Sequence, residues 1–286
     1  MMGKKLIKVF TVSLFLGFNF LVNSSAKAET VLERIESGGL LRIGINNNEI
    51  PFSYRDSNGE LQGICLDLVN LIKNELRDTL NRNIITTHLF NSNLSNRFQI
   101  VQDGIVDLEC GANSIREIKD FEVSFSEPFF STGIQFLAVR DKANQLRNNT
   151  AIEDVRIGVL ANTTTEEYVK QRFPEAQISL FRGISGSNLG VRAVENERID
   201  VFADDGILLL GAATSLNMSL SRDFILLPET PLTCERYGLI LPKNDPDWKA
   251  LIDRVITSSE EREIVGDWFA VADRFINNRS DCEIYD

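Results

Sequence analysis

The sequence is poor in the side chains that most often build metal and nucleophilic sites. It has one histidine, His88, and four cysteines, none of which belongs to a C-x-x-C pair. Zinc sites and Cys–His catalytic pairs need several such side chains close together. His88 itself lies in the alternating run 84–90, which predicts a strand. We therefore expect no metal site, no catalytic cysteine and no cofactor.

Positive charge is also scarce. The chain has 30 lysines and arginines against 41 acidic residues, and its net charge is −11. Residues 1–28 contain four lysines and no acid, so residues 29–286 carry a net charge of −15. Such a surface argues against nucleic acid or an anionic membrane as a partner. A small anionic ligand is still allowed, because a buried site sets its own local field.

A long apolar run occurs only near the N-terminus. Three lysines within residues 4–8 precede the apolar run 9–22, and Ala26-Lys27-Ala28 follows it. This pattern is typical of a cleaved Sec-type export signal, so we expect the mature chain to begin at Glu29. The run is too short to span a bilayer comfortably, and no cysteine follows it for lipid attachment. The sequence therefore predicts a periplasmic protein, secreted through its signal peptide and free in solution.

Short strands alternate with amphipathic helices along the rest of the chain, which indicates an α/β fold. Residues 41–45 alternate like a strand, and residues 65–76 place apolar side chains at helical spacing. A second series of strands and helices covers residues 156–214, and helices follow a strand at 237–241.

No low-complexity linker divides the chain, so we expect two lobes joined by continuous strands. We place the two crossings near residues 129–133 and 233–237. The first lobe would then comprise residues 29–130 and 237–286. The second lobe, residues 131–236, would be inserted between them, with a ligand cleft at the junction.

Four segments in order carry a resemblance to a known family. They include the following motifs: Gly44 to Tyr54, ending Pro51-Phe52-Ser53-Tyr54, then Gly63 to Leu68; Asp107 to Arg116, then Phe125 to Phe130; Gly158 to Glu166; and Asp200 to Asp205, then Tyr237 to Pro242. Together they resemble bacterial extracellular solute-binding proteins of family 3, the periplasmic polar amino-acid-binding proteins of ABC uptake systems, and most of all their glutamate/aspartate branch. The resemblance implies a two-lobed, type II periplasmic-binding-protein-like fold. It also implies a monomer, not an enzyme, that delivers a glutamine-, glutamate- or aspartate-like L-amino acid to a membrane permease.

A free amino acid presents a carboxylate and an ammonium group, and burying either one costs several kcal/mol unless it meets a partner. Arg116 is the expected partner of the carboxylate, because a guanidinium matches it in a bidentate manner. Gly111, Asn113 and Ser114 precede Arg116 in a loop after a strand, where ligands of α/β folds collect. The family's arginine lies nearer the Phe-Ser pair, where this chain has Lys119, so Lys119 stays the alternative.

The segment Thr163–Thr165 precedes an expected helix, whose first amides and hydroxyls can bind an anion or simply cap the helix. The resemblance places Thr163 and Thr164 on the ligand carboxylate. It places the acid that binds the ammonium group at Asp205, which is otherwise a plain N-cap. Asp204 aligns with a position that faces the ligand's side chain or its ammonium group.

The pocket for the ligand's side chain departs from the glutamate/aspartate branch. Asn46 replaces an arginine of that branch, whose later histidine is also missing here. Asn46, Asn48 and Asp204 could pair with an amide or a hydroxyl, and Arg97 is a candidate replacement cation. We therefore expect a polar amino acid, glutamine- or glutamate-like. Phe52 either packs against the ligand, as in the family, or belongs to the core.

All four cysteines lie beyond the export signal, so disulfides are expected. Cys110 and Cys234 both fall near the proposed crossings, which favours that pair. Cys65 and Cys282 would then pair with each other or stay free.

A different class of function is an exported enzyme on the same scaffold, such as a dehydratase or a lyase. Glu109, Asp204 or Asp205 could then act as an acid or a base. Consecutive strand positions point in opposite directions, so we do not expect Asp204 and Asp205 to share a proton. A receptor domain that feeds a sensor is a third alternative.

Overall fold

The structure is a computed structural model that describes residues 29–142, 155–220 and 222–269. The predicted export signal lies outside these ranges. The elements are α1 (Val31–Gly38), β1 (Leu40–Ile45), β2 (Asn48–Glu49), β3 (Ser53–Arg55), β4 (Leu61–Gln62), α2 (Ile64–Thr79), β5 (Thr86–Asn91), α3 (Arg97–Gln102), β6 (Leu108–Cys110), β7 (Val123–Phe125), β8 (Phe130–Thr132), β9 (Ile134–Val139), the 3-10 helix η1 (Arg140–Lys142), β10 (Arg156–Leu160), α5 (Thr164–Arg172), β11 (Gln177–Phe181), α6 (Gly186–Glu195), β12 (Val201–Asp205), α7 (Gly206–Ser215), β13 (Phe224–Leu227), β14 (Glu235–Tyr237), β15 (Ile240–Pro242), α8 (Pro246–Ile256) and α9 (Ser259–Phe269). None of the helices in these ranges combines the length and the apolar character that a membrane span requires.

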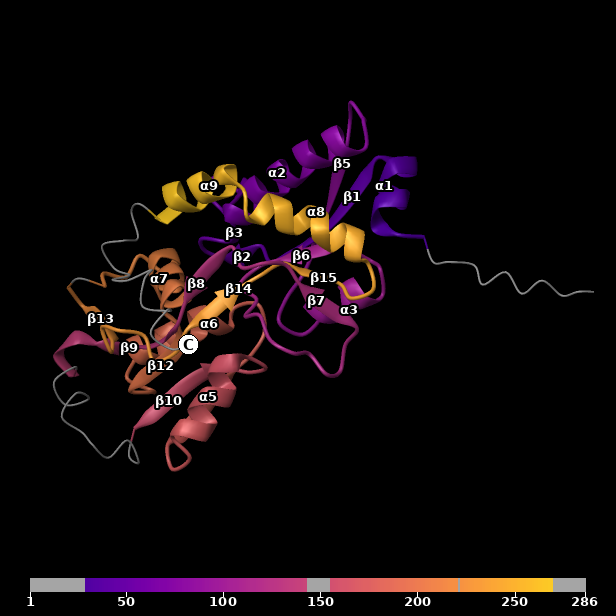
Figure 1. The fold of residues 1–286 in the computed structure, drawn as a ribbon. Coiled ribbons are helices and arrows are strands. Elements are labelled where there is room, and N and C mark those ends of the chain that lie inside the picture. The colour runs from indigo at the N-terminus through magenta and orange to yellow at the C-terminus, as the bar shows by residue number, and fades with distance from the viewer. Residues whose placement is uncertain (1–28, 143–154, 221, 270–286) are drawn as a thin grey trace, which may run out of the picture.

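The first lobe is built on a mixed sheet with the strand order β5-β1-β6-β15-β7. β1 runs parallel to β5 and β6, whereas β15 runs antiparallel to β6 and β7. Helices α2, α8 and α9 lie together along one side of this lobe (Figure 1). Trp248 of α8 is fully buried, and its indole N–H donates to the carbonyl oxygen of Asp107 over 2.8 Å. This bond ties a helix near the C-terminus to the beginning of β6.

The second lobe has a sheet of the order β11-β10-β12-β9-β13. β10 is parallel to β11 and β12, and β9 runs antiparallel to β12 and β13. Val169 of α5 belongs to one apolar cluster of this lobe, whereas Val191 of α6 and Leu209 of α7 pack with Phe202 in another. Gly190 of α6 lies directly against the ring of Phe202, where a Cβ atom would clash. The glycine therefore sets the close approach of α6 to the sheet.

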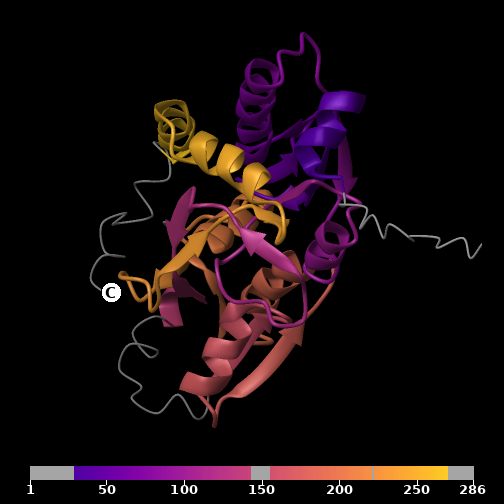
Figure 2. The same ribbon diagram turned by 45° about the vertical axis from the view of Figure 1, so that its right-hand side comes forward.

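Two antiparallel strands, β8 and β14, join the lobes (Figure 2). Phe130 is opposite Tyr237 in this ribbon, and Thr132 is opposite Glu235. Both strands lie within the segments predicted to cross between the lobes. The α/β class, the two lobes and the two crossings were thus predicted from the sequence.

The predicted pairing of Cys110 with Cys234 is wrong. Cys110 forms a disulfide with Cys65, with a Cα–Cα distance of 5.8 Å. Cys110 ends β6 and Cys65 lies in the first turn of α2, and both are fully buried in the core of the first lobe. The side chain of Cys110 thus faces the helix layer and not the crossing strands. Cys234 also takes part in a disulfide, and Cys282 lies outside the described residues.

Candidate ligand-binding site

A cavity of about 270 Å³ lies where the two lobes meet. Its size is near the lower end of the range of small-molecule sites, about 300–1,000 Å³, and suits a single small ligand. Many of its walls follow the ends of parallel strands, where ligands of α/β folds collect. The polar side chains of the wall include Asn46, Asn48, Glu49, Asn93, Arg97, Ser114 and Arg116 from the first lobe and Thr163, Thr164, Ser187, Asn188, Asp204 and Asp205 from the second.

The lobes are in contact around this cavity. Asn48 Nδ2 donates to the carbonyl oxygen of Ile184 over 3.2 Å, and Ser114 Oγ lies 3.5 Å from Thr164 Oγ1. Each of these contacts joins the first lobe to the second. The structure therefore represents a closed arrangement, in which a ligand would touch both lobes at once.

Arg116 and Thr164 form a positively charged, hydroxyl-bearing end of the cavity. Burial lowers the pKa of the Arg116 guanidinium, and the nearby Glu167 and Glu235 oppose this shift. An arginine stays charged in proteins, so this end of the cavity suits an anion. Arg116 also lies beside the ring of Phe98, 5.7 Å from its centroid.

The two threonines that were predicted to bind the carboxylate have different surroundings. Thr163 caps α5: its Oγ1 accepts the N–H of Glu166 over 3.1 Å and donates to the carbonyl oxygen of Leu160 over 2.8 Å. The hydroxyl of Thr164 instead faces Ser114 across the cavity. The first amides of a helix have no partner within it. Thr164 therefore offers both a hydroxyl and a first-turn amide, whereas the hydroxyl of Thr163 is already used.

Two adjacent acids, Asp204 and Asp205, form a negatively charged end of the cavity. Asp204 and Asp205 are only 3% and 4% exposed, and each has one buried carboxylate oxygen without a hydrogen-bond partner within the described ranges. Asp204 Oδ1 accepts the N–H of Asp205 over 3.0 Å, and Asp205 Oδ2 accepts a hydrogen bond from the hydroxyl of Tyr237. A buried carboxylate oxygen without a partner is costly, so this end suits a group that donates hydrogen bonds.

Burial raises the pKa of both acids. The pKa of Asp204 rises to about 7, with a smaller contribution from Glu49 on the other lobe. The pKa of Asp205 lies well above its usual range because of burial and of the neighbouring Asp204. A cationic ligand group would favour the ionised forms of both acids.

A buried polar cluster supports Arg97 behind the cavity wall. Arg97 donates to Asn113 Oδ1 over 2.9 Å, and Asn113 Nδ2 donates to Glu109 Oε2 over 2.6 Å. Glu109 also accepts a hydrogen bond from the hydroxyl of Ser92. Burial raises the pKa of Glu109 to about 7, although Ser92 and Arg97 lower it. Asn113 therefore positions Arg97 and is not itself part of the cavity wall.

Seven of the ten predicted ligand-binding residues line the cavity: Asn46, Ser114, Arg116, Thr163, Thr164, Asp204 and Asp205. Asn113, Gly111 and Phe52 do not. Phe52 is fully buried in the core, with its ring centroid 5.4 Å from that of Tyr237. Lys119, the alternative to Arg116, lines only a neighbouring surface groove, which Arg116 also borders.

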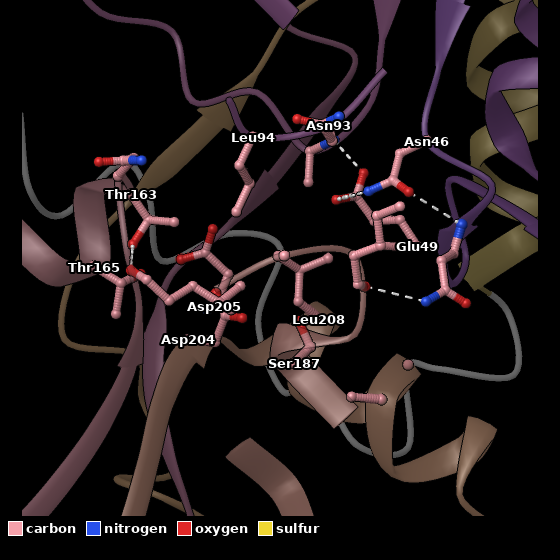
Figure 3. A pocket seen from close by; sticks show the side chains of 18 of the residues that line it. Asn46, Glu49, Asn93, Leu94, Thr163, Thr165, Ser187, Asp204, Asp205 and Leu208 are labelled. Atoms are coloured by element: carbon pink, nitrogen blue, oxygen red, sulfur yellow. Dashed lines mark hydrogen bonds between the residues drawn. The ribbon is translucent and has the colours of Figure 1, made fainter. Parts of the chain in front are cut away.

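The sequence analysis missed Glu49, which projects into the cavity beside Asn46 (Figure 3). Its Oε2 accepts the N–H of Ala112 over 2.9 Å. Burial raises its pKa, whereas Ala112 and Arg97 lower it. Asn46 was identified through the resemblance to the family. Glu49 lies three positions later, close behind the end of β1, and this place after a strand is the signal that could have found it.

Comparison with known proteins identifies the family. The sequence profile of the bacterial extracellular solute-binding proteins, family 3, matches residues 41–271. The chain belongs to this family. It is therefore a solute-binding protein.

The relatives and the solved structures agree with this assignment. The glutamate/aspartate import solute-binding protein of Escherichia coli (strain K12) is 26% identical over 253 residues, which cover 86% of this chain and 82% of that protein. The L-glutamate/L-aspartate-binding protein of Pseudomonas aeruginosa is also 26% identical. The matched residues cover 83% of this chain and 79% of that protein.

Two solved structures share the fold. One is an amino acid ABC transporter substrate-binding protein from Streptococcus pneumoniae bound to L-arginine. It has a TM-score of 0.70 and 20% sequence identity, and the match covers 85% of this chain and 97% of that one. The other is the ancestral amino acid-binding protein AncCDT-1, described as a precursor of cyclohexadienyl dehydratase. It has a TM-score of 0.69 and 22% sequence identity, and the match covers 84% of this chain and 99% of that one.

Proposed function

We propose that this protein captures one free polar L-α-amino acid between its lobes and delivers it to the permease of an ABC transporter. One observation carries the proposal: a buried, unpartnered carboxylate oxygen of Asp205 and the guanidinium of Arg116 line the same small cavity. An α-amino acid carries the two complementary charges, and each would meet a partner in this cavity.

Binding and closure are linked in this proposal. Arg116 and Ser114 belong to the first lobe, and Thr164 and Asp205 belong to the second. A ligand that bridges them gains its full set of contacts only when the lobes are closed, so it shifts the population toward the closed state. The transporter can then recognise the closed form.

The proposed location is the periplasm, reached through the export signal in residues 1–28. The proposed state is a monomer. Relatives that import glutamate and aspartate support an amino acid as the ligand class. Glutamine, glutamate and aspartate form the first panel of candidates.

An exported enzyme on the same scaffold is the second candidate, and Asp204 is the observation that favours it. A buried acid with a pKa near 7 can donate or accept a proton in a reaction. We propose binding without turnover, because Asp205 and Arg116 are complementary to the two charged groups of an intact amino acid.

Calorimetric titration of ligand-free protein with a panel of L-amino acids tests the proposal. The protein is unfolded and refolded beforehand to remove any ligand carried through purification. We expect one or a few polar amino acids to bind, and mass spectrometry of the released ligand to find it unchanged. A converted product, or no binding by any member of the panel, would contradict the proposal.

A further inference from the structure

Glu49 brings a further carboxylate to the cavity, opposite the pair formed by Asp204 and Asp205. Figure 3 shows Glu49 next to Asn46 on one side of the cavity, with Asp204 and Asp205 on the other. Glu49 Oε2 is fixed by the N–H of Ala112 at 2.9 Å, whereas Oε1 accepts only a long bond of 3.4 Å from Asn46 Nδ2. A carboxylate has about four lone-pair sites, so Glu49 retains the capacity to accept hydrogen bonds from a ligand.

The backbone next to Glu49 is shaped to receive this carboxylate. A Cβ atom at Gly111 would lie 3.1 Å from Glu49 Oε2 and 3.4 Å from Glu109 Oε1. The first of these distances is shorter than an ordinary van der Waals contact, so a larger residue would press on Glu49 Oε2 and require it to shift by a few tenths of an ångström. Gly111, first expected to touch the ligand, thus makes room for the side chain of Glu49.

The charges of the cavity decide what the ligand's side chain can be. If Arg116 binds the α-carboxylate and Asp205 the ammonium group, Glu49 and Asp204 remain, with Arg97 as the cation near them. Arg97 is already shared, because Asn113 and Ala112 accept its hydrogen bonds and Glu109 lies within its electrostatic reach. Arg55 and Arg182 also line the cavity, but both are exposed to solvent. The buried part of the remaining wall therefore carries two acids, Glu49 and Asp204, against the one shared guanidinium of Arg97.

An independent observation points to a hydrogen-bond donor in the ligand. Asp204 Oδ2 is buried, lines the cavity and has no hydrogen-bond partner among the residues that the structure describes. A ligand carboxylate placed beside ionised Asp204 would add a like charge and leave this oxygen unpaired. An amide, an amine or a guanidinium group would instead donate to Asp204 and Glu49.

We infer that Glu49 is a specificity-determining residue, and that together with Asp204 it selects an amino acid whose side chain ends in N–H donors over one that ends in a carboxylate. This inference rests on the proposed function. It departs from the glutamate/aspartate relatives, whose overall similarity does not decide the charge of this cavity.

Titration of the wild-type protein with L-glutamine, L-arginine and L-glutamate is the first test. We expect glutamine or arginine to bind at least about tenfold more tightly than glutamate, because hydrogen bonds to charged groups contribute substantially to affinity. Tightest binding of glutamate would overturn the inference and leave the proposed function intact. If none of the amino acids in the wider panel binds, the proposed function falls and the inference falls with it.

The variant Glu49→Gln keeps the shape and the acceptor for Ala112 but removes the charge. We expect it to weaken the preferred ligand by about tenfold and to narrow the ratio of the glutamate Kd to that of the preferred ligand. Glu60→Gln, at an exposed position outside the cavity wall, is the matched control and should keep the wild-type ratio. An unchanged ratio in Glu49→Gln would overturn the inference. If Glu49→Gln fails to fold, Asp204→Asn is the second variant, and it should also narrow the ratio of the glutamate Kd to that of the preferred ligand.

Discussion

The hydroxyl group of Tyr237 donates a hydrogen bond to Asp205 Oδ2, and this bond joins a crossing strand to the ligand cavity. Tyr237 is fully buried in the core of the first lobe, and its ring lies 5.4 Å from that of Phe52, centroid to centroid. Asp205 ends β12 of the second lobe. The acid proposed to bind the ammonium group is therefore positioned by the segment that connects the lobes.

We expect Tyr237→Phe to weaken amino-acid binding by about tenfold, the usual effect of losing a hydrogen bond to a charged group. The hydroxyl of Tyr237 lowers the pKa of Asp205, so its removal raises that pKa further. Because the ammonium group needs the ionised carboxylate, the loss should be larger at pH 6 than at pH 9. Calorimetry at both pH values measures it. Tyr168→Phe, outside the cavity wall, is the control, and a loss that does not vary with pH would speak against this role of Tyr237.

The structure also separates Arg116 from Lys119, which the sequence could not. Arg116 lines both the cavity and the neighbouring surface groove, whereas Lys119 lines only the groove. We expect Arg116→Ala to raise the Kd by about 30-fold or more, because removing one partner of a buried ion pair costs about 2–5 kcal/mol. Lys119→Ala should bind like the wild-type protein. Equal losses in the two variants, measured by titration with the same ligand, would refute the assignment.

The sequence predicted those parts of the fold that depend on local periodicity. Alternation in residues 41–45 and helical spacing in residues 65–76 correspond to β1 and α2. The rule that ligands gather after strand ends pointed to Ser114, whereas Asn46 and Asp205 came from the resemblance to the family; all three line the cavity. The predictions of β1 and α2 need only the period of the pattern.

The remaining features depend on the direction of single side chains. Cys110 pairs with Cys65 because its side chain faces α2, and its position near a crossing segment does not reveal this. Phe52 packs on Tyr237 instead of the cavity for the same reason. Glu49 reaches the cavity through a short β2 strand whose register no periodic pattern sets. Neighbouring strand positions face opposite sides, so a shift of one residue reverses each of these conclusions.

Gly211 of α7 provides a test of lobe closure. A Cβ atom at this position would clash with the carbonyl oxygen of Ile50 on the other lobe. Gly211→Ala should therefore penalise the closed state while slightly stabilising the helix itself, because alanine is the better helix former. We expect the Kd to rise by tenfold or more with no loss of thermal stability in the ligand-free protein.

Small-angle X-ray scattering and calorimetry check this expectation. With saturating ligand, Gly211→Ala should show less compaction than the wild-type protein. Gly266→Ala is the matched control, because Gly266 also lies in a helix and a Cβ atom there meets nothing within 4 Å. Full compaction and wild-type affinity in Gly211→Ala would show that this contact does not limit closure.

The disulfide between Cys65 and Cys110 should stabilise the first lobe without affecting the ligand. It closes a loop across a sequence separation of 45 residues. The chain-entropy estimate for such a loop is about 4 kcal/mol. We expect the double variant Cys65→Ala/Cys110→Ala to lose about 2–4 kcal/mol in urea unfolding, whereas its Kd well below the unfolding midpoint stays within about threefold of the wild-type value. A large loss of affinity would show that the disulfide also shapes the site.

Asp204 should lower the stability of the ligand-free protein at neutral pH. Its pKa is about 7 in the folded protein against an ordinary value of 3.8, because burial disfavours its charged form. The folded state then binds this proton more tightly than the unfolded state. The free energy of unfolding should therefore fall as the pH rises from about 4 to about 7, by on the order of 3 kcal/mol for this group.

Asp204→Asn removes this dependence, since asparagine does not ionise. We expect the variant to be more stable than the wild-type protein at pH 8 and about equally stable at pH 4, while it binds the amino acid more weakly. Urea unfolding of ligand-free protein at several pH values measures the difference between the two proteins. The two proteins are compared because acids with lowered pKa values, such as Asp200, make the free energy of unfolding rise with pH. Their contribution is the same in both proteins and cancels in the difference. Asp78→Asn, at an exposed position of α2, is the matched control. A difference that stays constant with pH would mean that Asp204 is ionised at no cost, and the cavity would then have to contain a cation that balances it.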